Sequence, residues 1–173
     1  MKRALVTLSL LLLLVAPPAH ALEVGEKAPD FLLTDVFGSR YTLASFKKRI
    51  LSVWYEGPGS YKQNERLSFK LRDEKIAGRW PGPNMDSIGI ANFQESAVPN
   101  AVLDLMIKRE WKKSKALVLC DRDARMQRLW GFRNGRSNIY VLDASRTLIW
   151  KTSGPLDARR ERQFLRFLQR ITR

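Results

Sequence analysis

Apolar residues recur along the chain in two patterns, as short continuous runs and as longer stretches with a helical period. Runs of about four to eight apolar residues between turn residues are typical of buried strands, and apolar residues three and four apart are typical of helices. Together the patterns predict strands over residues 50–55, 87–93, 116–120, 139–142 and 148–151, and helices over residues 60–76, 98–113 and 158–171. Strands alternating with helices favour an α/β layer fold with a parallel component.

The ends and inward faces of these elements follow from the same pattern. Residues 31–43 are expected to form an extended ribbon that turns at Gly38 and Ser39. Pro99 suits the first turn of the second helix, and Asp157 is expected to cap the last one. The residues expected to face inward are Tyr61, Leu67, Leu71 and Ile76 on the first helix, Val102, Leu103, Met106 and Ile107 on the second, and Phe164, Leu165, Leu168 and Ile171 on the last.

The first 21 residues have the three parts of an export signal. Lys2 and Arg3 precede an apolar run over residues 4–15, and residues 19–21 form a small-x-small cleavage site. The run is short for a membrane span, so a membrane anchor is the weaker interpretation. The sequence therefore predicts a signal peptide over residues 1–21 and a single domain over residues 22–173. We expect a periplasmic protein, with release beyond the envelope as the alternative.

Composition narrows the chemistry further. The chain has 173 residues, 31 Lys and Arg against 17 Asp and Glu, a formal charge of +14, one cysteine and one histidine. One cysteine excludes an internal disulfide or a dithiol pair, and one histidine excludes a multi-histidine metal site. Cleavage after residue 21 would also remove His20, and without it neither a Ser-His-Asp nor a Cys-His arrangement is available. We expect no metal and no cofactor.

Several motifs, in their order and spacing, resemble the thioredoxin-like fold, in the branch of exported thiol reductases and peroxiredoxins. Residues 25–31 match a Gly-x-x-Ala-Pro-x-Phe opening, and the other matching stretches are residues 119–123, 129–132, 139–143 and 148–150. Residues 90–92, 97–99 and 140–150 are similar to the YtfJ-type periplasmic proteins. The resemblance covers nearly the whole mature chain. It implies one α/β domain with a central mixed sheet flanked by helices.

The chain departs from this family at the thiol-exchange site. By register, the two positions of the family's Cys-x-x-Cys pair fall on Pro58 and Tyr61. The family's cis-proline would lie near Arg136 or Ser137, where the sequence has no proline. The resemblance therefore does not extend to disulfide exchange, and we expect a binding protein and not an enzyme, with a redox enzyme that uses Cys120 as the alternative.

The turn before the first helix is a candidate binding cleft. Ser60 and Gln63 have capping-box spacing, and a helix start of this kind attracts anions through its free N–H groups and its dipole. In the fold that the chain resembles, the loop around residues 134–137 faces this turn, so Arg133 and Arg136 are expected to add positive charge. The candidate residues for an anion or a protein partner are Gly57, Gly59, Ser60, Tyr61, Lys62, Arg133 and Arg136. The other interpretation is an ordinary capped turn without a ligand.

Arginines on the last helix form a second candidate surface. Residues spaced three and four apart lie on one helical stripe, and five arginines have this spacing: Arg159, Arg162, Arg166, Arg170 and Arg173. The stripe is either a solvated face or a surface that docks on lipid headgroups, acidic envelope polymers or an acidic envelope protein. Nucleic acid is disfavoured because the chain is expected to be exported and because Asp73, Glu74 and Asp104 interrupt the basic stretches.

Cys120 carries the alternative hypothesis of a thiol-dependent redox enzyme. It ends an apolar run, which is typical of a buried and inert cysteine. Asp121 and Asp123 follow it and are expected to raise its pKa. These two aspartates also have the spacing of a cation-binding pair, but with arginines beside them and no glutamate to complete a calcium loop a bare turn is favoured.

Overall fold

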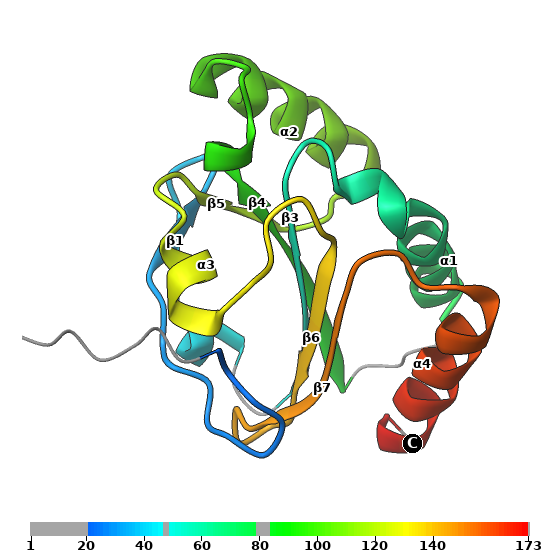
Figure 1. Ribbon diagram of the computed structural model, residues 1–173. Coiled ribbons are helices and arrows are strands. Elements are labelled where there is room, and N and C mark those ends of the chain that lie inside the picture. The colour runs from blue at the N-terminus through cyan, green and yellow to red at the C-terminus, as the bar shows by residue number, and fades with distance from the viewer. Residues whose placement is uncertain (1–20, 47–48, 79–83, 173) are drawn as a thin grey trace, which may run out of the picture.

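The computed structural model describes residues 21–46, 49–78 and 84–172 of the chain. The expected signal peptide, apart from Ala21, lies outside these residues, and so does Arg173 of the arginine stripe. These residues form one α/β domain on a mixed seven-stranded sheet, whose arrangement can be followed in Figure 1. The strands are β1 (Leu33–Asp35), β2 (Arg40–Tyr41), β3 (Ile50–Glu56), β4 (Met85–Asn92), β5 (Val118–Asp121), β6 (Asn138–Leu142) and β7 (Leu148–Ser153).

The strand order is β2-β1-β5-β4-β3-β6-β7, with β4 at the centre. β3, β4 and β5 are parallel, and β1, β6 and β7 run antiparallel to their neighbours. The expected α/β fold with a parallel component is therefore confirmed. The ribbon at the start of the sheet is also confirmed, because β1 and β2 pair as a hairpin around Gly38.

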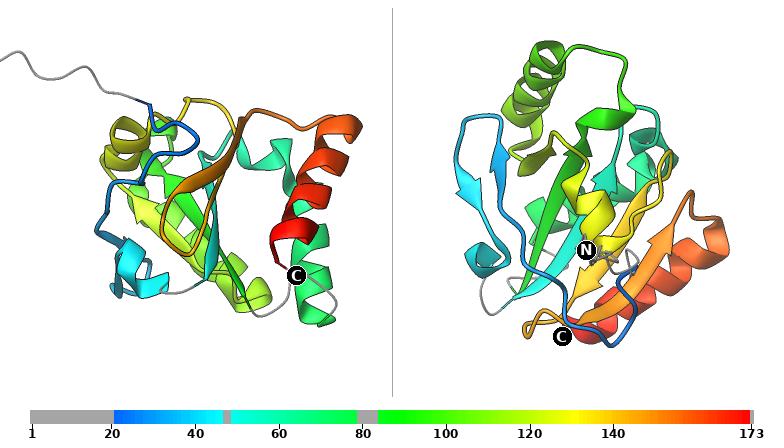
Figure 2. Two further views of the ribbon diagram at one scale, coloured as in Figure 1. Left: turned by 90° about the horizontal axis from the view of Figure 1, so that it is seen from below. Right: turned by 60° about the vertical axis from the view of Figure 1, so that its left-hand side comes forward.

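Helices cover both faces of the sheet (Figures 1 and 2). The α-helices of the described residues are α1 (Glu65–Ile76), α2 (Asn100–Ser114), α3 (Arg125–Trp130) and α4 (Ala158–Ile171), and the 3-10 helices are η1 (Leu43–Phe46), η2 (Tyr61–Gln63) and η3 (Phe93–Glu95). On one face, Tyr55 of β3 packs with Met126 and Trp130 of α3. On the other, Trp54 packs with α1 and α4. Within the described part of the chain, no helix is long and apolar enough to cross a membrane.

The last helix forms as the sequence predicts. α4 has the expected bounds, and Asp157 accepts a hydrogen bond from the Arg160 N–H at 2.8 Å, as an N-cap should. Phe164 and Leu168 are fully buried. A strict period and a capping residue are local signals, so the helix that they predict does not depend on which elements pack around it.

The predictions for the inward faces of the first and second helices are only partly confirmed. Leu67, Leu71 and Leu103 are buried as expected, and Ile107 is half-buried. The predictions for Tyr61, Ile76, Val102 and Met106 are wrong, because these side chains are 41%, 74%, 45% and 52% exposed. Each helix packs through a narrow stripe at its own side of the sheet, so the apolar residues beside that stripe remain in solvent.

The sequence pattern gave no sign of α3. This helix has six residues, it starts after Ala124 in the left-handed region, and its N-cap makes no side-chain hydrogen bond. Instead, Asp121 accepts hydrogen bonds from the N–H groups of Arg125 and Met126 at 2.8 and 3.0 Å. A side chain at the end of β5 therefore starts this helix, which a local capping pattern does not reveal.

Candidate functional site

The candidate cleft lies where β3 and β4 end and β6 begins. The turn after β3 faces the loop before β6, as the resemblance implied. The Gln63 Nε2 donates to the Gly135 carbonyl at 2.9 Å, and the Ser137 N–H donates to Gln63 Oε1 at 3.1 Å. One side chain thus joins two segments more than seventy residues apart in the sequence.

The predicted capping box is wrong. Ser60 is fully buried and makes no side-chain cap bond. Its Oγ accepts from the Gly57 N–H at 2.9 Å, and the N–H groups of Ser60 and Tyr61 both donate to the Gly57 carbonyl. The turn consumes these donors because a 3-10 helix, η2, intervenes before α1 begins at Glu65. Anion binding here stays a prediction, with fewer free N–H groups than a simple helix start would offer.

Two carboxylates that the sequence analysis missed border this cleft. Glu56 ends β3 and accepts a hydrogen bond from the Ser137 hydroxyl. Burial raises the pKa of the Glu56 carboxyl to about 7, the Ser137 bond opposes that shift, and the charge of Glu65 adds to it. Glu95 accepts from the Gly135 N–H at 3.0 Å. No spacing rule marks either residue, since they meet the cleft from different strand ends.

Glu95 packs so closely against Gly57 that this position has no room for a side chain. A Cβ at this position would overlap the Glu95 side chain, so η3 and the β3 turn approach each other only because the residue is glycine. The Glu95 carboxylate therefore lies beside the predicted anion-binding turn. This carboxylate opposes the attraction that the candidate cations Lys62, Arg133 and Arg136 would exert on an anion.

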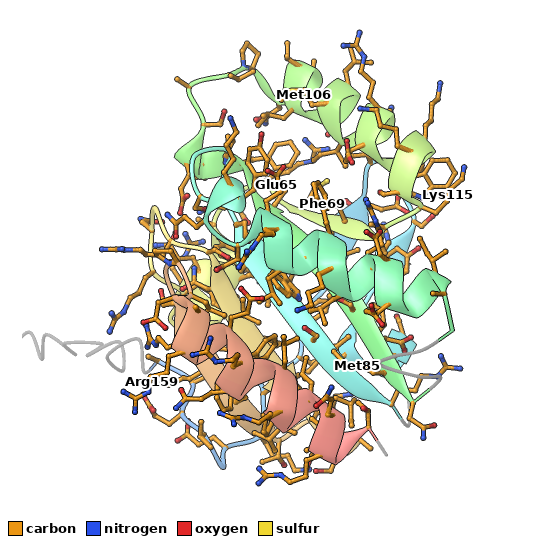
Figure 3. All side chains as sticks on the ribbon, turned by 90° about the vertical axis from the view of Figure 1, so that its right-hand side faces the viewer. Glu65, Phe69, Met85, Met106, Lys115 and Arg159 are labelled. Atoms are coloured by element: carbon orange, nitrogen blue, oxygen red, sulfur yellow. The ribbon has the colours of Figure 1, made fainter. Side chains whose placement is uncertain are left out.

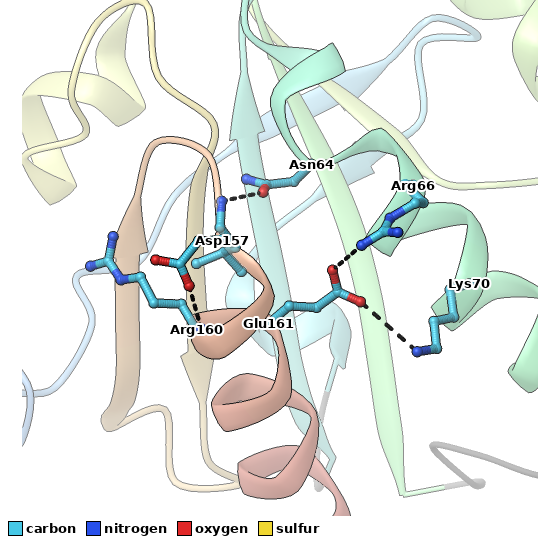
Figure 4. Close-up of polar contacts among 7 residues, drawn as sticks. Asn64, Arg66, Lys70, Asp157, Arg160 and Glu161 are labelled. Carbon is cyan, nitrogen blue, oxygen red and sulfur yellow. Dashed lines mark hydrogen bonds and ion pairs between the residues drawn. The ribbon is translucent and has the colours of Figure 1, made fainter.

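Asn64 holds the base of the cleft. Its side chain is buried, and its Nδ2 donates to Ser137 Oγ at 2.9 Å and to the Gly154 carbonyl at 3.1 Å. Its Oδ1 accepts from the Leu156 N–H at 2.9 Å, a bond drawn in Figure 4. Ser137 occupies the position near which the resemblance places a cis-proline. A polar network of Asn64, Ser137 and Glu56 fills this region.

The remaining candidate residues of the cleft are on the surface. Gly59, Lys62, Arg133 and Arg136 are exposed. The Lys62 ammonium lies 5.9 Å from the centroid of the Tyr61 ring, so it stays with its neighbour. The structure therefore places these residues around the rim of the cleft, whereas Gly57 and Ser60 are buried.

Cys120 lies away from the cleft and inside the protein. It is 3% exposed, and it pairs with Ala91 of β4 on one side and Thr34 of β1 on the other. Burial raises the pKa of its thiol to about 11, while Arg122 lowers it and the charges of Asp104 and Asp35 raise it further. The expected burial is confirmed, but the carboxylates that raise its pKa come from other strands and helices, and the adjacent residues expected to do so are not among them.

Asp121 has a structural role. Besides capping α3, its carboxylate accepts the Tyr55 hydroxyl at 2.9 Å from β3, across the intervening β4. Burial raises the pKa of Asp121, and these hydrogen bonds lower it. Among the residues that the structure describes, no group of acidic, cysteine or histidine side chains has the geometry of a metal site.

The arginine stripe of α4 is exposed to solvent. Arg159, Arg162, Arg166 and Arg170 are all exposed, and within the described ranges none forms an ion pair. The acidic Glu161 faces α1 instead, where it pairs with Arg66 at 2.9 Å and Lys70 at 3.9 Å (Figure 4). The positive charge of the stripe is therefore not compensated by the helix's own glutamate.

The fold and its neighbours among solved structures agree. The chain has a single-domain thioredoxin-like fold. It is similar to the exposed lipoprotein thioredoxin of Streptococcus pneumoniae (16% identity, 82% of this chain and 99% of that one, TM-score 0.61) and to a candidate thiol:disulfide interchange protein, DsbE, of Chlorobium tepidum (19%, 86% and 99%, 0.62). It is also similar to a thiol peroxidase of Chromobacterium violaceum (15%, 89% and 90%, 0.61). No protein-family model and no curated sequence matches the chain.

Proposed function

We propose that this protein is an exported, non-catalytic thioredoxin-like domain of the periplasm, related to the YtfJ-type proteins, that docks on an anionic surface through its α4 arginines. The observation that carries the proposal is the exposure of Arg159, Arg162, Arg166 and Arg170 without ion pairs among the described residues. Each basic residue held near an anionic membrane surface contributes about 1 kcal/mol to binding.

The absence of thiol exchange is inferred from three positions. Pro58 and Tyr61 stand where the resemblance expects cysteines, and both are exposed. The one cysteine is buried on β5, with a thiol pKa of about 11 that leaves little thiolate at neutral pH. The burial and the raised pKa of Cys120 therefore both count against a redox role for its thiol.

The arginine face is preferred over the cleft as the binding surface because of charge. Glu56 and Glu95 border the cleft, whereas α4 presents four described arginines on one stripe. At the cleft these carboxyls oppose the attraction that the rim cations Lys62, Arg133 and Arg136 exert on an anionic partner, whereas no ion pair offsets the described arginines of α4. A protein partner at the cleft remains the second hypothesis from the sequence.

The experiment is vesicle cosedimentation of the mature domain. We expect binding to vesicles of phosphatidylglycerol mixed with phosphatidylcholine, none to phosphatidylcholine alone, and steep weakening between low and physiological salt. The double variant Arg162→Glu, Arg166→Glu should weaken binding by about 30-fold or more.

The matched control also replaces two exposed arginines by glutamate, at positions away from α4. Arg40 lies on β2 and Arg125 on α3, both exposed and remote from α4. Arg40→Glu with Arg125→Glu should leave binding within about threefold of the parent if the α4 stripe is the contact. Equal losses in the two double variants, or salt-independent binding, would overturn the proposal.

N-terminal sequencing of the protein recovered from the periplasm tests cleavage after Ala21.

A further inference from the structure

A groove of about 880 Å³ runs along one face of β4, between α1 and α2. Figure 3 looks onto this side of the molecule, with Phe69 of α1 and Met106 of α2 on either side. Its floor includes Ser87, Gly89 and Ala91, which are exposed or only half-buried although β4 is the central strand of the sheet. A volume of this size is within the range of small-molecule sites.

The floor is open because the two helices pack at its two sides. Leu67 of α1 belongs to the cluster shared with α4, and Leu103 of α2 belongs to a separate cluster with Phe93 and Cys120. The first cluster reaches β4 at Met85 and the second at Ala91, and neither includes Ser87 or Gly89 between them. The other face of β4 is covered normally, because the alternate residues Ile88 and Ile90 are buried in the main core.

The walls of the groove carry large apolar side chains that face solvent. Tyr61, Phe69, Met106 and Ile76 line it, and each is more than two-fifths exposed. A single exposed apolar residue needs no explanation, but a contiguous set around a concave floor marks an interaction site.

Two cations lie at one end of the groove. α1 and α2 each follow one of two adjacent parallel strands, so both helices end at the same edge of the sheet, where Arg72 and Lys115 line the groove. The Arg72 guanidinium lies 4.7 Å from the Phe69 ring centroid, and the Lys115 ammonium 4.1 Å from that of Trp111. Within the described chain Lys115 has no acidic partner, and Arg72 contacts Asp73 at 3.4 Å.

The acidic groups that line the groove are already partnered. Asp86 pairs with Arg49 at 3.3 Å, and Glu110 pairs with Lys113 at 3.6 Å. Glu56, at the opposite end, accepts the Ser137 hydroxyl. The charge left for an occupant at the Arg72 end is therefore positive.

We propose that this groove binds a long-chain fatty acid, with its acyl chain along β4 and its carboxylate between Arg72 and Lys115. The eight residues of β4 span about 26 Å, enough for an extended acyl chain. An extended peptide is disfavoured, because β3 and β5 already pair with both edges of β4 and leave no backbone partners. The proposal is independent of the docking function of α4.

The test is titration of the mature domain with oleate, below its aggregation concentration, by calorimetry and by displacement of a fluorescent fatty acid. We expect one saturable site per chain. Gly89→Leu should fill the floor and lower the affinity by about tenfold or more. A Cβ at Gly89 would lie 3.4 Å from a Val118 methyl, an ordinary contact, and thermal melting checks that the variant is folded. Ser87→Leu, at an exposed floor position, is a second blocking variant with the same expectation.

A second experiment tests whether the cations at the end of the groove bind the carboxylate, by comparing oleate with its neutral analogue oleyl alcohol. Lys115→Glu should lower oleate affinity by about tenfold and leave oleyl alcohol unchanged. Lys112→Glu, an exposed change on α2 outside the groove lining, should alter neither. The α4 variants should bind oleate normally, and the groove variants should bind vesicles normally, so the two proposals fail separately.

Three results would overturn the fatty-acid proposal. The first is no saturable oleate binding by the parent, and the second is parental affinity in folded Gly89→Leu and Ser87→Leu. The third is a dimer in sedimentation that Gly89→Leu disrupts and oleate does not, because a second copy would then be the occupant.

Discussion

The Ser137 hydroxyl donates a hydrogen bond to Glu56, and so joins the last residue of β3 to the residue before β6. The same hydroxyl accepts a hydrogen bond from Asn64 at 2.9 Å. A half-buried carboxyl, a hydroxyl and an amide thus form one chain through the region where the resembled family carries out thiol exchange. Such networks are stable only when every member is satisfied, so their disruption is measurable.

Glu56 should make stability depend on pH. Burial raises the pKa of its carboxyl to about 7 from an ordinary 4.5, so between these values the folded protein binds more protons than the unfolded chain. The stabilisation is complete below the lower value and is lost as the pH rises through about 7, by about 3 kcal/mol in all. Urea unfolding from pH 4.5 to 8.5 measures this slope.

Glu56→Gln should remove most of that pH dependence, and it should stabilise the protein at pH 8 because no charge is then buried. The amide oxygen still accepts the Ser137 hydroxyl. Glu110→Gln, at an exposed carboxylate of α2, is the control and should keep the parental slope. An unchanged slope in Glu56→Gln would show that other groups titrate.

Asn64→Ala should be strongly destabilising. It leaves the Gly154 carbonyl and the Leu156 N–H without their buried partner and also removes the bond to Ser137. The expected loss is about 3 kcal/mol in the free energy of unfolding. Asn134→Ala, at an exposed position of the facing loop, should change it by less than about 0.5 kcal/mol. Similar losses in both variants would contradict the network.

Cys120 should react slowly while the protein is folded. At pH 8 a thiol of pKa about 11 is about 100-fold less ionised than one at the ordinary value of 9, and burial slows the reagent further. Labelling with a chromogenic disulfide should therefore be fast only in denaturant. Cys120→Ser should match the parent in vesicle binding. Rapid labelling of the folded protein, with peroxide turnover, would restore the redox hypothesis.

Glu161 should contribute modestly and in a salt-dependent way. It bridges Arg66 and Lys70, whose side chains are 84% and 55% exposed, so each pair is screened by solvent. Glu161→Gln should cost about 1 kcal/mol or less at low salt and nothing measurable in 1 M NaCl. Unfolding at the two salt concentrations measures this, and a salt-independent loss would point to a packing role instead.

Sequence by itself determined the elements whose signals are local. The bounds of α4, its Asp157 cap and the burial of Phe164 follow from a period and a capping residue, and the alternation of strands and helices fixed the fold class. The arginine stripe also follows from spacing alone. These features need no knowledge of distant residues.

Only the tertiary structure decided what distant segments do to one another. Gln63 has capping-box spacing, yet its amide bonds across to Gly135 and Ser137 because that loop folds back over the turn. The exposed floor at Gly89 depends on the separation of two helices, which the strand's own pattern cannot report. The pKa of Glu56 likewise depends on burial by other elements. Periodicity constrains a residue's own element, but burial, partners and charge depend on what packs against it.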